Sequence, residues 1–110
     1  MSRRLSHYIK HERRRTGFSQ ADVAYLFGVR DASQVSRYER GKHLPPLRTA
    51  LAYEAILGVP VAELFPGAFT IARRSLLRRA RRRTSILEKL PDTARNARRK
   101  RSLERLLASQ

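Results

Sequence analysis

The sequence contains no cysteine, few acidic residues and no long apolar run. Without cysteine the chain can form neither disulfides nor thiolate metal sites, and cysteine usage leaves its redox compartment undetermined. No apolar stretch approaches the roughly 20 residues that cross a bilayer. No apolar segment follows the first residues, as a secretory signal would require. These absences predict a soluble, cytoplasmic chain that does not take a membrane as its partner.

Sequence features of enzymes are missing as well. No glycine-rich phosphate loop is present, and Asp22, Asp31 and Glu39 fit capping or ion-pairing roles better than catalytic ones. His7 and His11 stand four residues apart, a spacing that could hold a metal on a helix, but no third ligand lies near them in the sequence. We therefore expect no enzymatic activity, no cofactor and no metal.

Positive charge is what the sequence has in excess. Its 110 residues include 25 Lys and Arg against 9 Asp and Glu, which gives a formal net charge of +16. This excess predicts a polyanionic partner. Nucleic acid is the first candidate and the one we expect, ahead of an anionic membrane surface. Hydrophobic residues make up 41% of the chain, enough for a compact core. The length allows one small domain plus an extension.

The segment from Ser19 to Gly41 predicts two short helices joined by a tight turn. Ser19 is a good N-cap, and Asp22 can return its hydrogen bond in a capping box. Gly28 follows the first helix where a left-handed residue is needed. The apolar residues of this helix recur at helical spacing. They are Val23, Ala24 and Phe27 on one face, with Leu26 beside them.

The second helix of this segment has one apolar and one polar face. Val29 is expected to be an apolar plug in the turn, and Asp31 is expected to cap the helix, with Gln34 three residues later. Val35 and Tyr38, three residues apart, are predicted to face inward. The outward face then consists of Ser33, Ser36, Arg37 and Arg40, and Gly41 ends the helix.

Further helices are predicted on both sides, and no strand-like alternation is present. The predicted ranges are Leu5–Arg15, Leu47–Leu57, Val61–Phe65, Thr70–Leu90 and Thr93–Ala108. In the first of these helices Leu5, Tyr8, Ile9 and Glu12 fall on one side. The apolar residues of the second are Leu47, Ala50, Leu51, Ala55 and Leu57. Pro66-Gly67 is expected to end the third.

The last 41 residues have a different composition. Residues 70–110 carry 14 Lys and Arg against 3 Asp and Glu, whereas residues 1–69 carry 11 and 6. Arginine and leucine are good helix formers, so the extension is expected to be helical. From Phe69 onward, apolar residues recur at steps of three, four or seven. They are Phe69, Ala72, Leu76, Ala80, Leu87 and Leu90.

Three blocks of the sequence resemble, in order, the Cro and lambda-repressor-like (XRE) helix-turn-helix transcriptional regulators. The blocks are TGFSQADVAYLFGV, VSRYERGKHLPPL and LAYEAILGVPVAELF. The resemblance implies an all-α fold, with a five-helix lambda-repressor-like DNA-binding domain over residues 1–69 and a basic, Arg-rich helical extension over residues 70–110. The sequence departs from the commonest members by one additional residue between Gly28 and Val35. Either the turn is longer or the second helix starts later.

The second helix of such a motif lies in the major groove of DNA. Its outward face therefore holds the candidates for base contact. Arg37 can bind guanine O6 and N7 through both ends of its guanidinium, and Gln34 can either reach adenine or cap the helix. The candidates for base contact are Ser33, Gln34, Ser36 and Arg37.

The resemblance also implies contacts to the DNA backbone. Gln20 would donate to a phosphate, at a helix N-terminus where free amides already attract anions. The other backbone candidates lie at the end of the second helix and beyond it: Arg40, Lys42 and His43. By the same resemblance, Glu39 pairs with an arginine of the first helix, here Arg13.

The sequence thus predicts a transcriptional repressor that binds double-stranded DNA specifically, as a homodimer on a palindromic operator, and that is nucleoid-associated when bound. Two alternatives stay open. One is an antitoxin-like interaction module that regulates its own operon and binds an acidic protein partner through residues 70–110. The other is a non-specific nucleic-acid-binding protein driven by the arginine-rich extension. The apolar stripe of the extension could pair two subunits or pack on the bundle.

Overall fold

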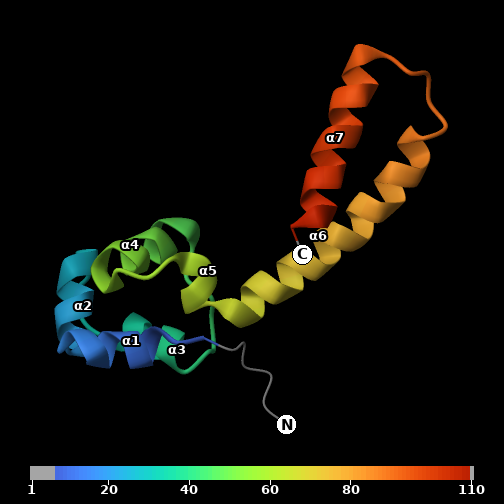
Figure 1. The fold of residues 1–110 in the computed structure, drawn as a ribbon. Coiled ribbons are helices and arrows are strands. Elements are labelled where there is room, and N and C mark those ends of the chain that lie inside the picture. Colours follow the sequence, from blue (N-terminus) through green and yellow to red (C-terminus); the bar gives the residue numbers. More distant parts are fainter. Residues whose placement is uncertain (1–6, 110) are drawn as a thin grey trace, which may run out of the picture. The chain divides into compact units, whose positions relative to one another are not determined.

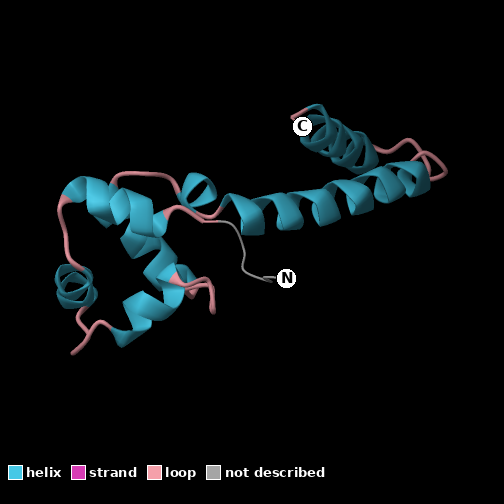
Figure 2. Cartoon of the chain, turned by 90° about the horizontal axis from the view of Figure 1, so that it is seen from below, coloured by secondary structure: helices cyan, strands magenta, loops and turns pink. Residues whose placement is uncertain are grey.

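The computed structural model describes residues 7–109, and every regular element among them is a helix (Figures 1 and 2). The predicted all-α fold is therefore confirmed. Connections are short, and the helices follow one another along the chain. They are α1 (Ile9–Thr16), α2 (Gln20–Phe27), α3 (Ser33–Glu39), α4 (Leu47–Leu57), α5 (Val61–Leu64), α6 (Pro66–Leu87) and α7 (Ala94–Ala108).

The chain separates into two compact units, Met1–Phe69 and Thr70–Gln110. Helices α1 to α5 belong to the first unit and α7 to the second, while α6 begins in the first and continues into the second.

The first unit is built around the ring of Tyr53, which is fully buried. Three other aromatic rings meet it edge-on: Phe27 at a centroid distance of 4.9 Å, Tyr38 at 6.2 Å and Phe65 at 6.3 Å. Aromatic pairs favour this geometry because the positive edge of one ring meets the negative face of the other. Burial also raises the pKa of the Tyr53 phenol. The remaining buried members of this core are Ile9, Val23, Ala24, Val35, Leu57 and Leu64.

Helix α1 begins later than predicted, at Ile9. Tyr8 precedes the helix, and its backbone N–H donates to the carbonyl of Leu64 in α5 (2.9 Å). Ile9 is buried, whereas Tyr8, predicted to lie on the same side of the helix, is its N-cap residue and is 51% exposed. The expectation for Leu5 lies outside the described residues.

The predicted bounds of α4 are confirmed, and its apolar residues divide between the core and solvent. Ala50, Tyr53 and Leu57 are buried. The helix carries apolar residues on two faces, so spacing alone did not decide between them, and the large ring of Tyr53 occupies the core. The residues that face solvent instead are Leu47, Leu51 and Ala55.

Pro66-Gly67 follows the end of α5, as predicted, but it also opens the next helix, α6. Proline lacks a backbone N–H, and the first position of a helix needs none, so the ring is tolerated there. Helix α6 consequently starts four residues before Thr70 and ends at Leu87, three residues before the predicted Leu90. Helix α5 ends at Leu64.

In the second unit, α6 and α7 form a helical hairpin. The guanidinium of Arg73, early in α6, donates to the carbonyl of Ser109, just after α7, so the two helices run antiparallel (Figure 1). The predicted apolar stripe is only partly correct. Ala80 and Leu87 are buried as expected, but the stripe continues through Leu77. Leu76 lies one residue away, about 100° around the helix. The predicted stripe residues that are exposed are Phe69, Ala72, Leu76 and Leu90.

Candidate nucleic-acid interface

Helix α2 begins with the capping box that the sequence predicts. The Ser19 hydroxyl accepts a hydrogen bond from the backbone N–H of Asp22 (3.0 Å), and the Ser19 backbone N–H donates to the Asp22 carboxylate (2.8 Å). These bonds from Ser19 hold the pKa of Asp22 below its ordinary value. Val23 and Ala24 are buried as predicted, with Phe27 partly buried against the core, while Leu26 is 52% exposed. The start of α2 is thus fixed by local hydrogen bonds.

Two glycines bracket the connection and α3. Gly28 follows α2 with φ 79°, and Gly41 follows α3 with φ 72°. Both predicted stops are therefore confirmed, because only glycine adopts this left-handed conformation without cost. Val29, in contrast, is 46% exposed, so it is not the predicted plug. Its backbone N–H donates to the carbonyl of Ala24 (3.0 Å), so Val29 belongs to the closing turn of α2.

Helix α3 starts at Ser33, with Ala32 at the N-cap position. The Asp31 carboxylate still stabilises this end, because it accepts hydrogen bonds from the Ser33 backbone N–H (2.9 Å) and hydroxyl (2.6 Å). These bonds, the one from the hydroxyl first, lower the pKa of Asp31. Asp31 therefore stabilises the start of α3, as predicted, but it lies one residue before the N-cap position, which Ala32 occupies.

The inner side of α3 is held by a buried ion pair. The Arg13 guanidinium of α1 donates to both carboxylate oxygens of Glu39, with Nε–Oε2 at 2.5 Å and Nη2–Oε1 at 3.0 Å. Its remaining end donates to the carbonyl of Phe18 (2.9 Å). The hydrogen bond to Glu39 raises the pKa of Arg13. The pairing expected from the family resemblance is therefore confirmed.

Gln20 joins the same network. Its side-chain nitrogen donates to Glu39 Oε1 (3.0 Å), so side chains of α1 and α2 both bind the one carboxylate of α3. Val35 and Tyr38 are buried beside it, as predicted. The Gln20 side chain is half-buried and engaged within the protein in this structure, a partner that the sequence did not indicate.

The outer side of α3 presents most of the predicted contact residues to solvent. Ser33, Gln34, Arg37 and Arg40 are exposed, and Ser36 is half-buried. Lys42 and His43, just after the helix, are exposed too. Arg30, in the connection before α3, is another exposed cation that was not among the predicted contact residues. Its place directly before the second helix was the signal that could have identified it.

Other kinds of site are not formed by the described residues. Between His7 and Ser109, no three His, Cys, Asp or Glu side chains come together as a metal would need. None of the helices in that range is both long and apolar enough to cross a membrane. The chemistry available at α3 is hydrogen bonding and positive charge.

Comparison with known proteins identifies the first five helices. Residues 4–64, more than half of the chain, match the model of a protein family described as a helix-turn-helix domain. No curated protein and no solved structure matches the chain.

Proposed function

The chain belongs to the helix-turn-helix domain family, and from this we propose that it is a sequence-specific transcriptional regulator of double-stranded DNA. We assign it to the Cro and lambda-repressor-like (XRE) type, with residues 1–69 as the DNA-binding domain and residues 70–110 as an extension. It has no catalytic role in this proposal. A regulator of this kind works where the chromosome is, in the cytoplasm and associated with the nucleoid.

The observation that carries this proposal is the two-sided character of α3. Its inner side is fixed by Val35, Tyr38 and the buried Glu39. Its outer side is polar, basic and exposed. A helix held in one orientation can place hydrogen-bonding groups against base edges, since the major groove is about 12 Å wide and admits one helix.

Specific residues follow from this arrangement. Arg37 is the principal base contact, because an exposed guanidinium can bind guanine bidentately. Ser33, Gln34 and Ser36 contribute further base contacts. Arg40, Lys42 and His43 bind backbone phosphates next to α3. Gln20 reaches a phosphate with the amide proton that it does not share with Glu39.

We further propose a homodimer that represses by covering a promoter. One α3 spans only a few base pairs, so a single copy has little specificity. Two copies bound to half-sites one helical turn apart, about 34 Å, read twice as many base pairs and so raise the specificity.

Selection of bound duplexes from a random pool tests the proposal with the full-length protein. The selected sequence should be palindromic, and the protein should bind it about a thousandfold more tightly than random duplex at about 150 mM salt. A ratio near one would overturn the regulator and favour non-specific binding. A selected site without two-fold symmetry would overturn the homodimer alone.

Replacing Arg37 with alanine should weaken binding to the selected duplex by about 1–3 kcal/mol and relax the preference at one base pair. The reason is loss of a bidentate contact to a base edge. Fluorescence anisotropy on a set of single-base variants of the duplex measures both effects.

Arg40→Ala provides the matched control, since it removes the same charge three residues away. It should weaken all duplexes equally and reduce the slope of log affinity against log salt by about 0.9. If Arg37→Ala behaves in the same way as Arg40→Ala, Arg37 contacts a phosphate and the base assignment is wrong.

A further inference from the structure

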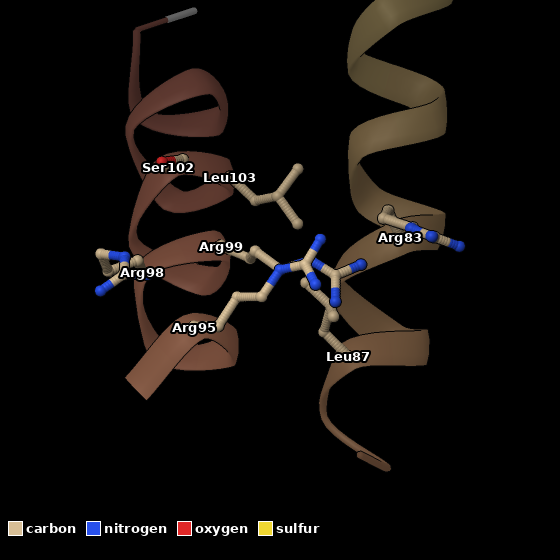
Figure 3. A pocket seen from close by; sticks show the side chains of 7 residues that line it. All are labelled: Arg83, Leu87, Arg95, Arg98, Arg99, Ser102 and Leu103. Carbon is tan, nitrogen blue, oxygen red and sulfur yellow. The ribbon is translucent and has the colours of Figure 1, made fainter. Parts of the chain in front are cut away.

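An open cleft lies between α6 and α7 in the second unit, and it is lined mainly by arginines (Figure 3). Its volume is about 580 Å³, within the usual range for ligand sites. Arg83 and Leu87 come from α6, and Arg95, Arg99 and Leu103 are among the residues that α7 contributes. The side chains that line it include no carboxylate. The cleft thus combines positive charge with a small apolar floor.

Two of the arginines extend into the space between the helices. Figure 3 shows Arg95 and Arg99 reaching from α7 toward Leu87 on α6, whereas Arg98 points away from α6. Two guanidinium groups directed into one space repel each other, and a partly apolar surround strengthens that repulsion. An anion bound between them would turn the repulsion into attraction.

Arg99 is held in this position by a buried side chain. Asn96, only 9% exposed, accepts a hydrogen bond from Arg99 Nη1 (3.0 Å) and donates to the carbonyl of Pro91 (2.8 Å). Its own backbone N–H donates to the hydroxyl of Thr93, the N-cap of α7 (3.1 Å). Because the guanidinium is already ordered, a ligand loses less side-chain entropy on binding to it. Asn96 is therefore a positioning residue for the cleft.

The residue types indicate which anion fits. Guanidinium groups bind phosphate and carboxylate bidentately, but one carboxylate carries too little charge to neutralise two of them. No aromatic residue occurs in residues 70–110, so the stacking platforms that hold nucleic-acid bases are missing. A second hollow, lined by Arg98, Arg101, Ser102 and Arg105, continues from the first because they share Arg98 and Ser102.

We propose that the α6–α7 cleft is a phosphate-binding site that takes successive phosphate groups in a chain, with Arg95 and Arg99 as its principal ligands. It recognises the phosphates and not the bases. The phosphates can come from a free polyphosphate or nucleotide tail, or from the backbone of a nucleic acid. This site shares no residue with α3, and it does not depend on the function proposed above.

Calorimetry with inorganic tripolyphosphate tests the site on the full-length protein at about 150 mM salt. Arg95→Gln/Arg99→Gln should lower the affinity at least about tenfold, because it removes two charge-assisted contacts. Arg78→Gln/Arg82→Gln is the matched control: it removes the same charge from exposed positions of α6 that do not line the cleft, and it should change the affinity less than twofold. Equal losses in both variants, or no binding by the wild type, would overturn the site.

Two further arms separate the ligand classes. An oligoglutamate of the same charge should bind more weakly than tripolyphosphate. Tighter binding of the peptide would replace the phosphate proposal with an acidic protein partner. If the double variant does not keep the wild-type helical content, Arg95→Gln alone, at an exposed position, should still lower tripolyphosphate affinity about threefold, and an unchanged affinity would overturn the site.

The source of the phosphate follows from binding to a random duplex. If it is the nucleic-acid backbone, Arg95→Gln/Arg99→Gln should reduce the salt slope for duplex binding by about 1.8, at 0.9 for each contact, and tripolyphosphate should compete with duplex. If the duplex slope is unchanged while tripolyphosphate affinity falls, the ligand is a free polyphosphate. Neither result depends on Arg37, so Arg37→Ala should leave tripolyphosphate binding unchanged.

Discussion

Replacement of Glu39 with alanine is expected to lower the free energy of unfolding of the first unit by about 3–5 kcal/mol. The change leaves the buried Arg13 guanidinium without its carboxylate, since Nε and Nη2 both lose their acceptor. It also removes the acceptor of the Gln20 amide. Removing one member of a buried pair costs more than the pair contributes, because the remaining charge stays out of water.

Urea unfolding followed by tyrosine near-ultraviolet circular dichroism measures this loss. All four tyrosines lie in residues 1–69, so the signal reports on the first unit alone. Glu63→Ala is the control, because Glu63 is exposed and its loss should cost less than about 0.5 kcal/mol. The double change Arg13→Met/Glu39→Leu should recover most of the stability, as replacing both members with apolar residues removes the unpaired charge. Equal midpoints for Glu39→Ala and Glu63→Ala would show that the pair is not stabilising.

Replacement of Ala24 with glutamate is expected to abolish the cooperative thermal unfolding of the first unit. Ala24 is 2% exposed within the core that α2 shares with α3 and α4. A glutamate there would bury an unpaired carboxylate, which costs several kcal/mol even after relaxation. Such a cost is comparable with the whole stability of a small domain, about 5–15 kcal/mol.

The neighbouring residue offers a stringent comparison. Tyr25 is 82% exposed on the same helix, so Tyr25→Glu introduces the same charge into the same helix and should change stability by less than about 0.5 kcal/mol. The remaining tyrosines still report on the unit. A sharp thermal transition in Ala24→Glu would mean that the assignment of Ala24 to the core is wrong.

Local hydrogen bonding explains what could be predicted from the sequence. The capping box of Ser19 and Asp22 and the glycine stops of α2 and α3 each involve residues within a few positions of one another. Their geometry is therefore contained in a short stretch of sequence. The Arg13–Glu39 pair spans 26 residues and was expected only from the family resemblance.

Tertiary packing explains what could not be predicted. In α4 either of two apolar faces satisfied the helical spacing, and only the cluster of rings around Tyr53 decided between them. In α6 the buried side of the helix includes Leu77 and not Leu76, a difference of one residue that helical spacing left open. For Gln20 the family role gave no sign of the hydrogen bond to Glu39. A helix can be found locally, but its buried side is chosen by its neighbours.

The left-handed glycines at the ends of α2 and α3 have a consequence for genetic variation. Every codon for glycine begins with GG. A single-base change that replaces the glycine with another amino acid always introduces a Cβ. At Gly28 a Cβ would meet no atom within 4 Å, so the penalty of about 1–2 kcal/mol comes from the backbone alone. Asparagine, which tolerates φ 79° best, is two base changes away. No single-base change at these two codons therefore supplies a residue that ends the helix without this penalty.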